Sequence, residues 1–340
     1  MQNFFRVFLF LFMVFATVPS KAQLQQFTIQ NIALPSELRD FDNQFSCLNI
    51  HKRRFFLMPE SRILEGQEAK LYSIKLSDIN HYFHDTTYQL TYQKHAIVGF
   101  DKLVNKMLQQ GQVCEGLEAM VIKGKEVFLS VETTTASAYC FILKGHLKDN
   151  NVVLDTTKLL AVWKPVKPKG EAIYNASFEC MELRGKRLQL FFEYNYFEGN
   201  NYVYSINKNL KNNSKDSVRI SRMPYRISDI KSIGKNHYTA INSFYKGGGK
   251  DTINRPSVTD TVSYSLVSNG KAFHDYARLV DIYFNGNEFT WKPLYEMPVM
   301  YEGFNWEGIA HYKGGYFIVN DKYSPSKPYY SSLMYLKPAP

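Results

Sequence analysis

Residues 305–321 read NWEGIAHYKGGYFIVND, and this stretch contains the pattern that decides the fold. Residues 309–312 and 316–319 are two short runs rich in β-branched and aromatic residues, and Lys313-Gly314-Gly315 separates them as a tight turn. The stretch therefore predicts a β-hairpin. Glu307 stands before its first strand and Asp321 follows its second. The meaning of these two acids depends on whether the pattern recurs.

The same pattern occurs at four earlier places in the chain. These hairpins read FSCLNIHKRRFFLMPES from Phe45, CEGLEAMVIKGKEVFLSVE from Cys114, FECMELRGKRLQLFFEYN from Phe178 and ISDIKSIGKNHYTAINS from Ile227. One polar residue leads each of the five hairpins, and we call these the lead residues: Ser46, Glu115, Glu179, Ser228 and Glu307. A second set, the partner residues, ends the second strands: Glu60, Glu132, Glu193, Asn242 and Asp321.

The spacing of the hairpins predicts a repeat architecture. Each interval holds about four strands with their loops, which is the content of a β-propeller blade of roughly 40–50 residues in compact cases. After the fifth hairpin only SSLMYLKP remains, whereas FTIQNIAL, from Phe27, is a strand without a hairpin partner. We therefore expect an all-β, five-bladed β-propeller, closed by its N-terminal strand. One domain, residues 23–340, accounts for the chain after its leader.

The first 22 residues have the features of a secretory signal peptide. Arg6 gives a positive start, residues 7–18 are apolar, and Ser20-Lys21-Ala22 provides small residues for cleavage after Ala22. The alternative is a membrane anchor, but the apolar run is short for a span. We expect a secreted or periplasmic protein, and no later stretch of the sequence predicts a membrane span.

Composition narrows the class of partner. The chain has 340 residues, of which 45% are hydrophobic and 15% aromatic, as expected for a folded β-rich protein. The net charge of +10 favours an anionic small molecule or glycan as ligand, and no segment resembles a nucleic-acid-binding module. We expect a monomer. The four cysteines, Cys47, Cys114, Cys140 and Cys180, fit no zinc motif, and we expect free buried thiols, with one disulfide as the alternative.

The lead residues predict a metal site. The first strand of each propeller blade lines the central channel, so residues at equivalent places form a ring. Three glutamates in one ring would repel each other without a cation. Oxygen ligands in this number suit Ca²⁺ better than Mg²⁺ or Zn²⁺. The alternative is that five unrelated polar residues begin the hairpins. The expected calcium ligands are Ser46, Glu115, Glu179, Ser228 and Glu307.

The order Ser, Glu, Glu, Ser, Glu resembles the central calcium site of the soluble calcium-activated nucleotidases (apyrases), which are five-bladed propellers. CEGLEAMVIKGKEVFLSV is similar to that family's second-blade hairpin, and FSCLNI, SFECME, ISDIKS and WEGIAHY fall where its other ligand hairpins fall. The chain also resembles the "esterase-like activity of phytase" and SdiA-regulated propellers of secreted bacterial proteins, through FSCLNIHKRRFFLMPESR and NWEGIAHYKGGYFIVND. The resemblance spans residues 45–321.

The resemblance implies a site at one mouth of the channel. Apyrases carry Asp-Asp-Arg-Thr-Gly after the second strand of the first blade, and Pro59-Glu60-Ser61-Arg62 keeps one acid and the arginine. A calcium-dependent hydrolase of phosphate or other anionic esters is thus expected, because arginine suits phosphate. Its expected catalytic residues are Glu60, Arg62, Glu132 and Glu193. The alternative is a non-catalytic binding or cell-envelope module with structural calcium.

Overall fold

The computed structural model describes residues 24–40, 42–167, 170–211, 216–247, 252–321 and 331–339. The predicted signal peptide, residues 1–22, lies outside this range. None of the helices formed by the described residues has the length and apolar character that a membrane crossing requires.

The fold consists mainly of β-strands. The strands are β1 (Phe27–Ile32), β2 (Phe45–His51), β3 (Arg54–Pro59), β4 (Lys70–Lys75), β5 (Tyr92–Val98), β6 (Cys114–Lys123), β7 (Glu126–Thr133), β8 (Tyr139–Lys148), β9 (Asn151–Trp163), β10 (Cys180–Arg184), β11 (Arg187–Phe191), β12 (Asn201–Asn207), β13 (Asp216–Ile220), β14 (Arg226–Gly234), β15 (His237–Phe244), β16 (Tyr276–Phe284), β17 (Glu288–Glu296), β18 (Trp306–Tyr312), β19 (Gly315–Asn320) and β20 (Leu333–Pro338). Short helices connect some of them: α1 (Leu76–His84), α2 (Phe100–Gln109), α3 (Thr261–Val267), α4 (Val299–Glu302), and the 3-10 turns η1 (Ser36–Arg39) and η2 (Ile63–Glu65).

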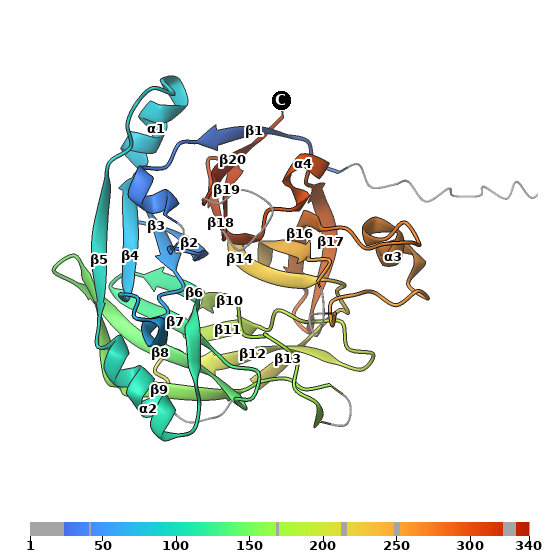
Figure 1. The fold of residues 1–340 in the computed structure, drawn as a ribbon, viewed down its shortest axis with the longest axis horizontal. Helices are drawn as coiled ribbons and strands as arrows, with labels where there is room; N and C mark the ends of the chain where they lie inside the picture. The colour runs from blue at the N-terminus through green and yellow to red at the C-terminus, as the bar shows by residue number, and fades with distance from the viewer. Residues whose placement is uncertain are drawn as a thin grey trace, which may run out of the picture.

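The strands form antiparallel groups of four around a centre (Figure 1). One sheet has the order β1-β20-β19-β18, and two sheets have eight strands each. Each eight-stranded sheet divides into two antiparallel groups that meet in a short parallel contact, β5 with β9 and β13 with β17. The first strands, β2, β6, β10, β14 and β18, lie nearest the centre and contact one another. The all-β, propeller-like fold expected from the hairpin repeat is therefore confirmed.

The N-terminal strand closes the last group. β1 pairs antiparallel with β20 along its whole length, from Phe27 opposite Pro338 to Ile32 opposite Leu333. Phe27 packs edge-on against Tyr295 and Tyr316, which belong to two different groups of strands. The outer edge of β20 is thus covered by a strand from the opposite end of the chain.

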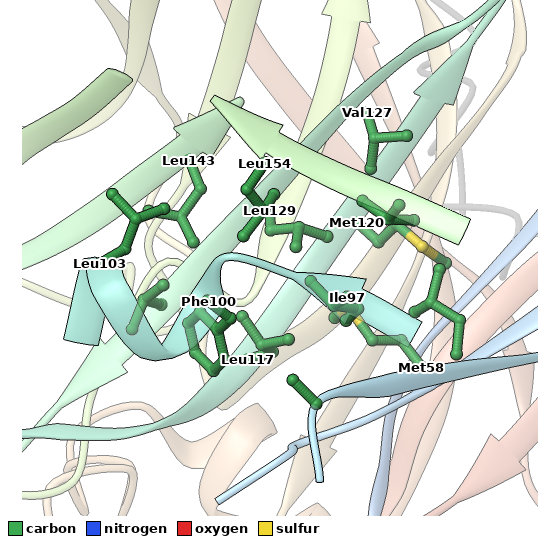
Figure 2. Close-up of a cluster of buried hydrophobic side chains, with 14 of the residues drawn as sticks. Met58, Ile97, Phe100, Leu103, Leu117, Met120, Val127, Leu129, Leu143 and Leu154 are labelled. Carbon is green, nitrogen blue, oxygen red and sulfur yellow. The ribbon is translucent and has the colours of Figure 1, made fainter. Parts of the chain in front are cut away.

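The core lies between neighbouring groups of strands. Figure 2 shows the largest cluster, where Leu103 and Phe100 of α2 meet side chains such as Leu117, Leu129 and Leu143 from β6, β7 and β8. The helix presents its buried residues at helical spacing, Phe100, Leu103, Val104 and Met107. The sequence DKLVNKMLQQ, residues 101–110, has the matching amphipathic pattern. The four cysteines are buried free thiols that form no disulfide bond, as expected.

The structure differs from the sequence interpretation at α1. The hairpin repeat predicts strands and turns in this part of the chain, but residues 76–84 are helical, with His81 and His84 in the last turn. Leu76, Ile79 and Tyr82 form its buried face. The segment is short, and Lys75 gives its start no side-chain cap, so the usual helix-start signal is missing.

Candidate active site

Irregular strand pairing places the lead residues at the centre. In four of the five hairpins the pairing register shifts by one residue, and the unpaired residue is the lead residue: Ser46, Glu115, Ser228 and Glu307. Glu179 directly precedes β10. A β-bulge turns a side chain out of the normal alternation of a strand. The five positions are therefore structurally similar, which the hairpin alignment predicted.

One large cavity opens where the central strands begin, and we call it the acidic cavity. Its volume is about 630 Å³. Two arginines, Arg62 and Arg226, are the basic residues among the described side chains that line it. Its acidic lining residues are far more numerous: Glu60, Glu65, Glu115, Glu118, Glu132, Glu179, Glu193, Asp275, Glu302, Glu307 and Asp321. All four predicted catalytic residues and four of the five predicted metal ligands thus share this cavity.

The two serines of the predicted ring differ from the glutamates. The Ser46 hydroxyl donates a hydrogen bond to the Leu117 carbonyl at 2.6 Å, and the Ser228 hydroxyl donates to the Trp306 carbonyl at 2.6 Å. Each bond links one group of strands to the next. Ser228 is absent from the cavity lining. Both serines therefore connect neighbouring groups in this structure.

Several carboxylates in the cavity lack a compensating partner. One oxygen each of Glu115, Glu132, Glu179 and Glu193 is buried without a hydrogen bond from any described residue. Unpaired polar atoms in a protein interior cost free energy, so such atoms indicate a missing ligand, proton or ion. Within the described part of the chain, however, no three His, Cys, Asp or Glu side chains are close enough together to hold a metal ion.

Arg226 supplies positive charge at the centre. Its Nη2 atom lies 2.5 Å from Glu307 Oε1 and also bonds to Asn305, while Nη1 lies 4.0 Å from Glu193 Oε2. Burial lowers the pKa of Arg226, but Glu307, Glu179 and Glu193 outweigh this effect, so the pKa is raised and Arg226 stays charged. The sequence interpretation missed this residue. The sequence does contain a signal for Arg226. The fourth hairpin has the neutral residues Ser228 and Asn242 at the lead and partner positions, where most other hairpins carry acids, and the basic Arg226 stands two residues before Ser228.

Glu60 and Arg62 form a second ion pair at the cavity wall. Arg62 Nε lies 2.5 Å from Glu60 Oε2, and Arg62 also reaches Glu65 at 3.4 Å. Burial raises the pKa of Glu60 to about 7; Arg62 opposes this rise and Asp321 adds to it. A group with this pKa can both give and take a proton near neutral pH.

The other cavity carboxyls are also shifted towards the protonated form. Burial, with Glu179 and Glu115 nearby, raises the pKa of Glu132 to about 8. Burial raises the pKa of Glu193 to about 8, although Arg226 opposes this. Burial and adjacent carboxylates raise the pKa values of Glu118 and Glu179 well above normal. Glu118, three residues after Glu115, is another site residue that the sequence interpretation missed.

Aromatic side chains form part of the cavity lining, and two of them are exposed. Tyr174 and Tyr245 are each 43% exposed. Phe244, Tyr276 and Phe304 also line the cavity. The acidic interior is thus combined with apolar faces at the entrance, a combination that suits ligands with both hydroxyl groups and C–H faces.

A buried ion pair lies deeper in the centre. Lys231 Nζ is 2.9 Å from Asp229 Oδ1, and Asp229 Oδ2 accepts a hydrogen bond from the Ile309 backbone at 2.9 Å. Cys47 Sγ lies 3.8 Å from both charged groups. Burial raises the pKa of this thiol to about 12, which keeps it protonated and unreactive. These side chains fill the central space between the first strands.

Comparison with known proteins identifies the fold but no family. No protein-family model matches the chain, and no curated protein sequence matches it. Among solved structures, the exo-β-1,3-galactanase of Phanerochaete chrysosporium is similar in two forms. The form with galactose has a TM-score of 0.52 at 10% identity and covers 91% of this chain; the variant with β-1,3-galactotriose has 0.50 at 9% and covers 93%. The present chain spans 67% and 66% of those chains, about two thirds of their length.

A GH43 β-1,3-galactosidase with galactodeoxynojirimycin has a lower TM-score of 0.47 at 10% identity. The two galactanase structures correct the expected resemblance: they belong to a sugar-cleaving enzyme, so the predicted kinship with nucleotidases and phytase-like propellers is wrong. The predicted activity, hydrolysis of phosphoric esters or anhydrides, is therefore also wrong. The physical reason lies in the cavity, because its two arginines are already paired with carboxylates, Arg62 with Glu60 and Arg226 with Glu307, which leaves no free cation for a phosphate among the described lining residues.

Proposed function

We propose that this chain is a secreted or periplasmic hydrolase of glycosidic bonds, built as a five-bladed propeller with its active site in the acidic cavity. The observation that carries the proposal is the set of buried carboxyl groups with raised pKa values in one open cavity. Glycoside hydrolysis needs a protonated carboxyl group to donate to the leaving oxygen and a second carboxylate on the other side of the sugar.

Glu132 is the proton donor. Burial among other carboxyl groups raises its pKa to about 8, so it is protonated at neutral pH, and one of its buried oxygens has no described partner. Glu60 is the second carboxyl group of the pair and acts as the carboxylate, because its pKa of about 7 is the lower of the two. The ion pair with Arg62 fixes the orientation of Glu60 and stabilises its charged form. The surrounding acids favour the positive charge that develops on the sugar ring.

The entrance suits a carbohydrate. Sugar rings have C–H faces that pack on aromatic rings, and Tyr174 and Tyr245 present such faces at the rim. The volume of about 630 Å³ is in the range of sites that hold small ligands. The two galactanase structures act on or bind galactose-containing sugars, which supports a glycan as the substrate class.

The test is release of sugar or aryl alcohol from a panel of aryl glycosides and oligosaccharides. We expect turnover of at least one β-linked substrate and a loss of about 10²–10⁴-fold in Glu60→Gln. Glu132→Gln should also lose activity. Glu171→Gln is the matched control, because Glu171 is exposed and outside the cavity lining. No turnover across the panel, or equal activity in Glu60→Gln, would contradict the proposal and leave a non-catalytic glycan-binding module.

We also propose that Ca²⁺ binds among the predicted ligands that line the acidic cavity, Ser46, Glu115, Glu179 and Glu307, with side-chain movements that bring their oxygens together; Ser228, the fifth predicted ligand, lies outside the cavity lining. The unpartnered oxygens of Glu115 and Glu179 support a missing cation, and oxygen donors are what Ca²⁺ prefers. The ion would neutralise the ring beyond what Arg226 achieves and would hold the groups of strands together. Thermal unfolding in EDTA and after adding calcium tests this: the calcium-dependent rise in Tm should vanish in Glu115→Gln/Glu179→Gln, and no rise in the unaltered protein would refute it.

A further inference from the structure

The turns that end the five central hairpins all carry exposed basic residues. Each central strand leads through a short turn into the second strand of its group. The turns differ in sequence, yet every one of them contributes lysine or arginine to the surface. These exposed residues, which we call the basic face, are Lys52, Arg53, Lys123, Lys125, Arg184, Lys186, Lys235 and Lys313.

The basic face lies at the end of the molecule opposite the acidic cavity. The central strands begin at the lead residues, which lie at the cavity, and run away from it. β6, for example, runs from Cys114 to Lys123, and a strand rises about 3.3 Å per residue. Because the five central strands lie side by side, their turns come together at the far end. The molecule therefore has one acidic and one basic end.

The charges of the basic face are not neutralised within the molecule. Lys52, Arg53, Lys123, Lys186 and Lys235 form no ion pair with any described residue. Two acids at this end are paired with cations outside the turns: Glu126 contacts Lys144 and Lys208 at 2.8 and 2.6 Å, and Asp216 contacts Arg187 at 2.5 Å. A third, Glu182, accepts a hydrogen bond from the Ser232 backbone at 3.0 Å, so the exposed cations of the turns outnumber the acids among them. The cations of the turns are thus available to an external anion.

The arrangement of the turns on the basic face indicates which kind of anionic partner it can bind. The turns are short and are distributed around the axis instead of along a groove. The hollow between the β10–β11 and β14–β15 turns, lined by Arg184 and Lys235, measures about 180 Å³. This is too small for a polymer strand, whereas cations on short turns arranged around one axis can contact a flat layer of anionic groups together.

We propose that the basic face binds an anionic phospholipid surface and directs the acidic cavity away from it. The proposal is independent of the hydrolase assignment. Lysine and arginine near an anionic bilayer each strengthen binding by about fivefold, and the cations of five turns act on the same surface. The carboxylates of the cavity would at the same time be repelled from that surface and face the solution.

Co-sedimentation of the mature protein with vesicles tests this. We expect binding to vesicles of phosphatidylcholine with phosphatidylglycerol, little binding to phosphatidylcholine alone, and release at high salt. Lys123→Glu/Lys186→Glu should weaken binding by about 25-fold or more, from about fivefold per cation removed. The matched control is Lys102→Glu/Lys271→Glu, which changes the net charge equally at exposed positions on α2 and beyond α3.

Retained binding in the control with loss in the turn variant supports the proposal. Equal loss in both variants would overturn it, because net charge alone would then explain the binding. Absence of binding to the anionic vesicles would also overturn it, and retention on an immobilised anionic polysaccharide in that case would assign the face to a soluble polyanion instead.

Discussion

Arg226 stabilises the acidic cavity at the scale of a single residue. Its guanidinium contacts Glu307 and lies near Glu193, and both are buried. We expect Arg226→Met to lower the free energy of unfolding by about 3–5 kcal/mol at pH values above 8, because buried carboxylates lose their counter-charge. In acid the loss should be smaller, because the carboxyls are then protonated. Urea denaturation at high and at low pH measures the two losses of stability, with Arg53→Met at an exposed position as the control. A loss that is the same at all pH values would show that Arg226 does not act as the counter-charge of these carboxylates.

Glu60 predicts a pH dependence of stability. Its pKa rises from 4.5 to about 7 in the folded chain, so the folded chain binds the proton more tightly than the unfolded chain. The free energy of unfolding should therefore decrease as pH rises from 4.5 to 7, by up to about 3 kcal/mol for this group. Glu60→Gln should flatten this decrease in EDTA, whereas Glu65→Gln, at an exposed carboxyl group, should leave it unchanged. If the free energy of unfolding of Glu60→Gln fell with pH as steeply as that of the unaltered protein, the pH dependence would have to come from other groups.

At the scale of the element, glycines next to the bulges allow the groups of strands to approach one another. A Cβ atom on Gly308 would lie 2.8 Å from both Leu48 Cγ and Val319 Cγ1. On Gly116 it would lie 3.1 Å from the Glu60 Cβ and carbonyl oxygen. These contacts explain why Glu-Gly occurs in both CEGLE and WEGIAHY: the glutamate points to the centre, and the glycine admits the neighbouring strand.

We expect Gly308→Ala to destabilise the protein by about 1–3 kcal/mol, because the added methyl group would force β18 away from Leu48 of β2 and displace the Val319 side chain. Gly199→Ala is the matched control, since nothing lies within 4 Å of its Cβ position. The Tm of the two variants, measured by circular dichroism, provides the comparison. A Tm for Gly308→Ala equal to that of the control would show that the close approach is not needed.

The hairpins were predictable because their alternation, turns and polar ends repeat five times along the sequence. The lead residues were found through this repetition. Arg226 and Glu118 were not, because they lie outside the repeated positions and their roles depend on which carboxylates the ring brings close. The serine roles also could not be predicted: whether the Ser46 hydroxyl faces a cation or the Leu117 carbonyl is decided by the neighbouring group of strands. Sequence similarity in short hairpins likewise said little about the chemistry of the cavity.

At the scale of the whole molecule, the opposite ends have opposite charge while the net charge remains +10. The acidic residues gather at the beginnings of the central strands and the basic ones at their ends. This arrangement can persist only if the ring stays closed, because opening it would expose the carboxylates of the cavity and let solvent reach the Asp229–Lys231 ion pair. Closure depends on the pairing of β1 with β20.

The closure can be tested by moving β1 within the chain. Because Phe27 lies opposite Pro338 and Ala339 donates a backbone hydrogen bond to Gln26, a short glycine-rich turn can join residue 339 to residue 26. A permuted chain that begins at Ser36 and ends with β1 after this turn should keep the Tm of the parent, since every strand pair is preserved. The same chain without β1 exposes the edge of β20 and should unfold at lower temperature and aggregate. If the shortened chain were as stable and as soluble as the permuted one, β1 would not be the strand that closes the ring.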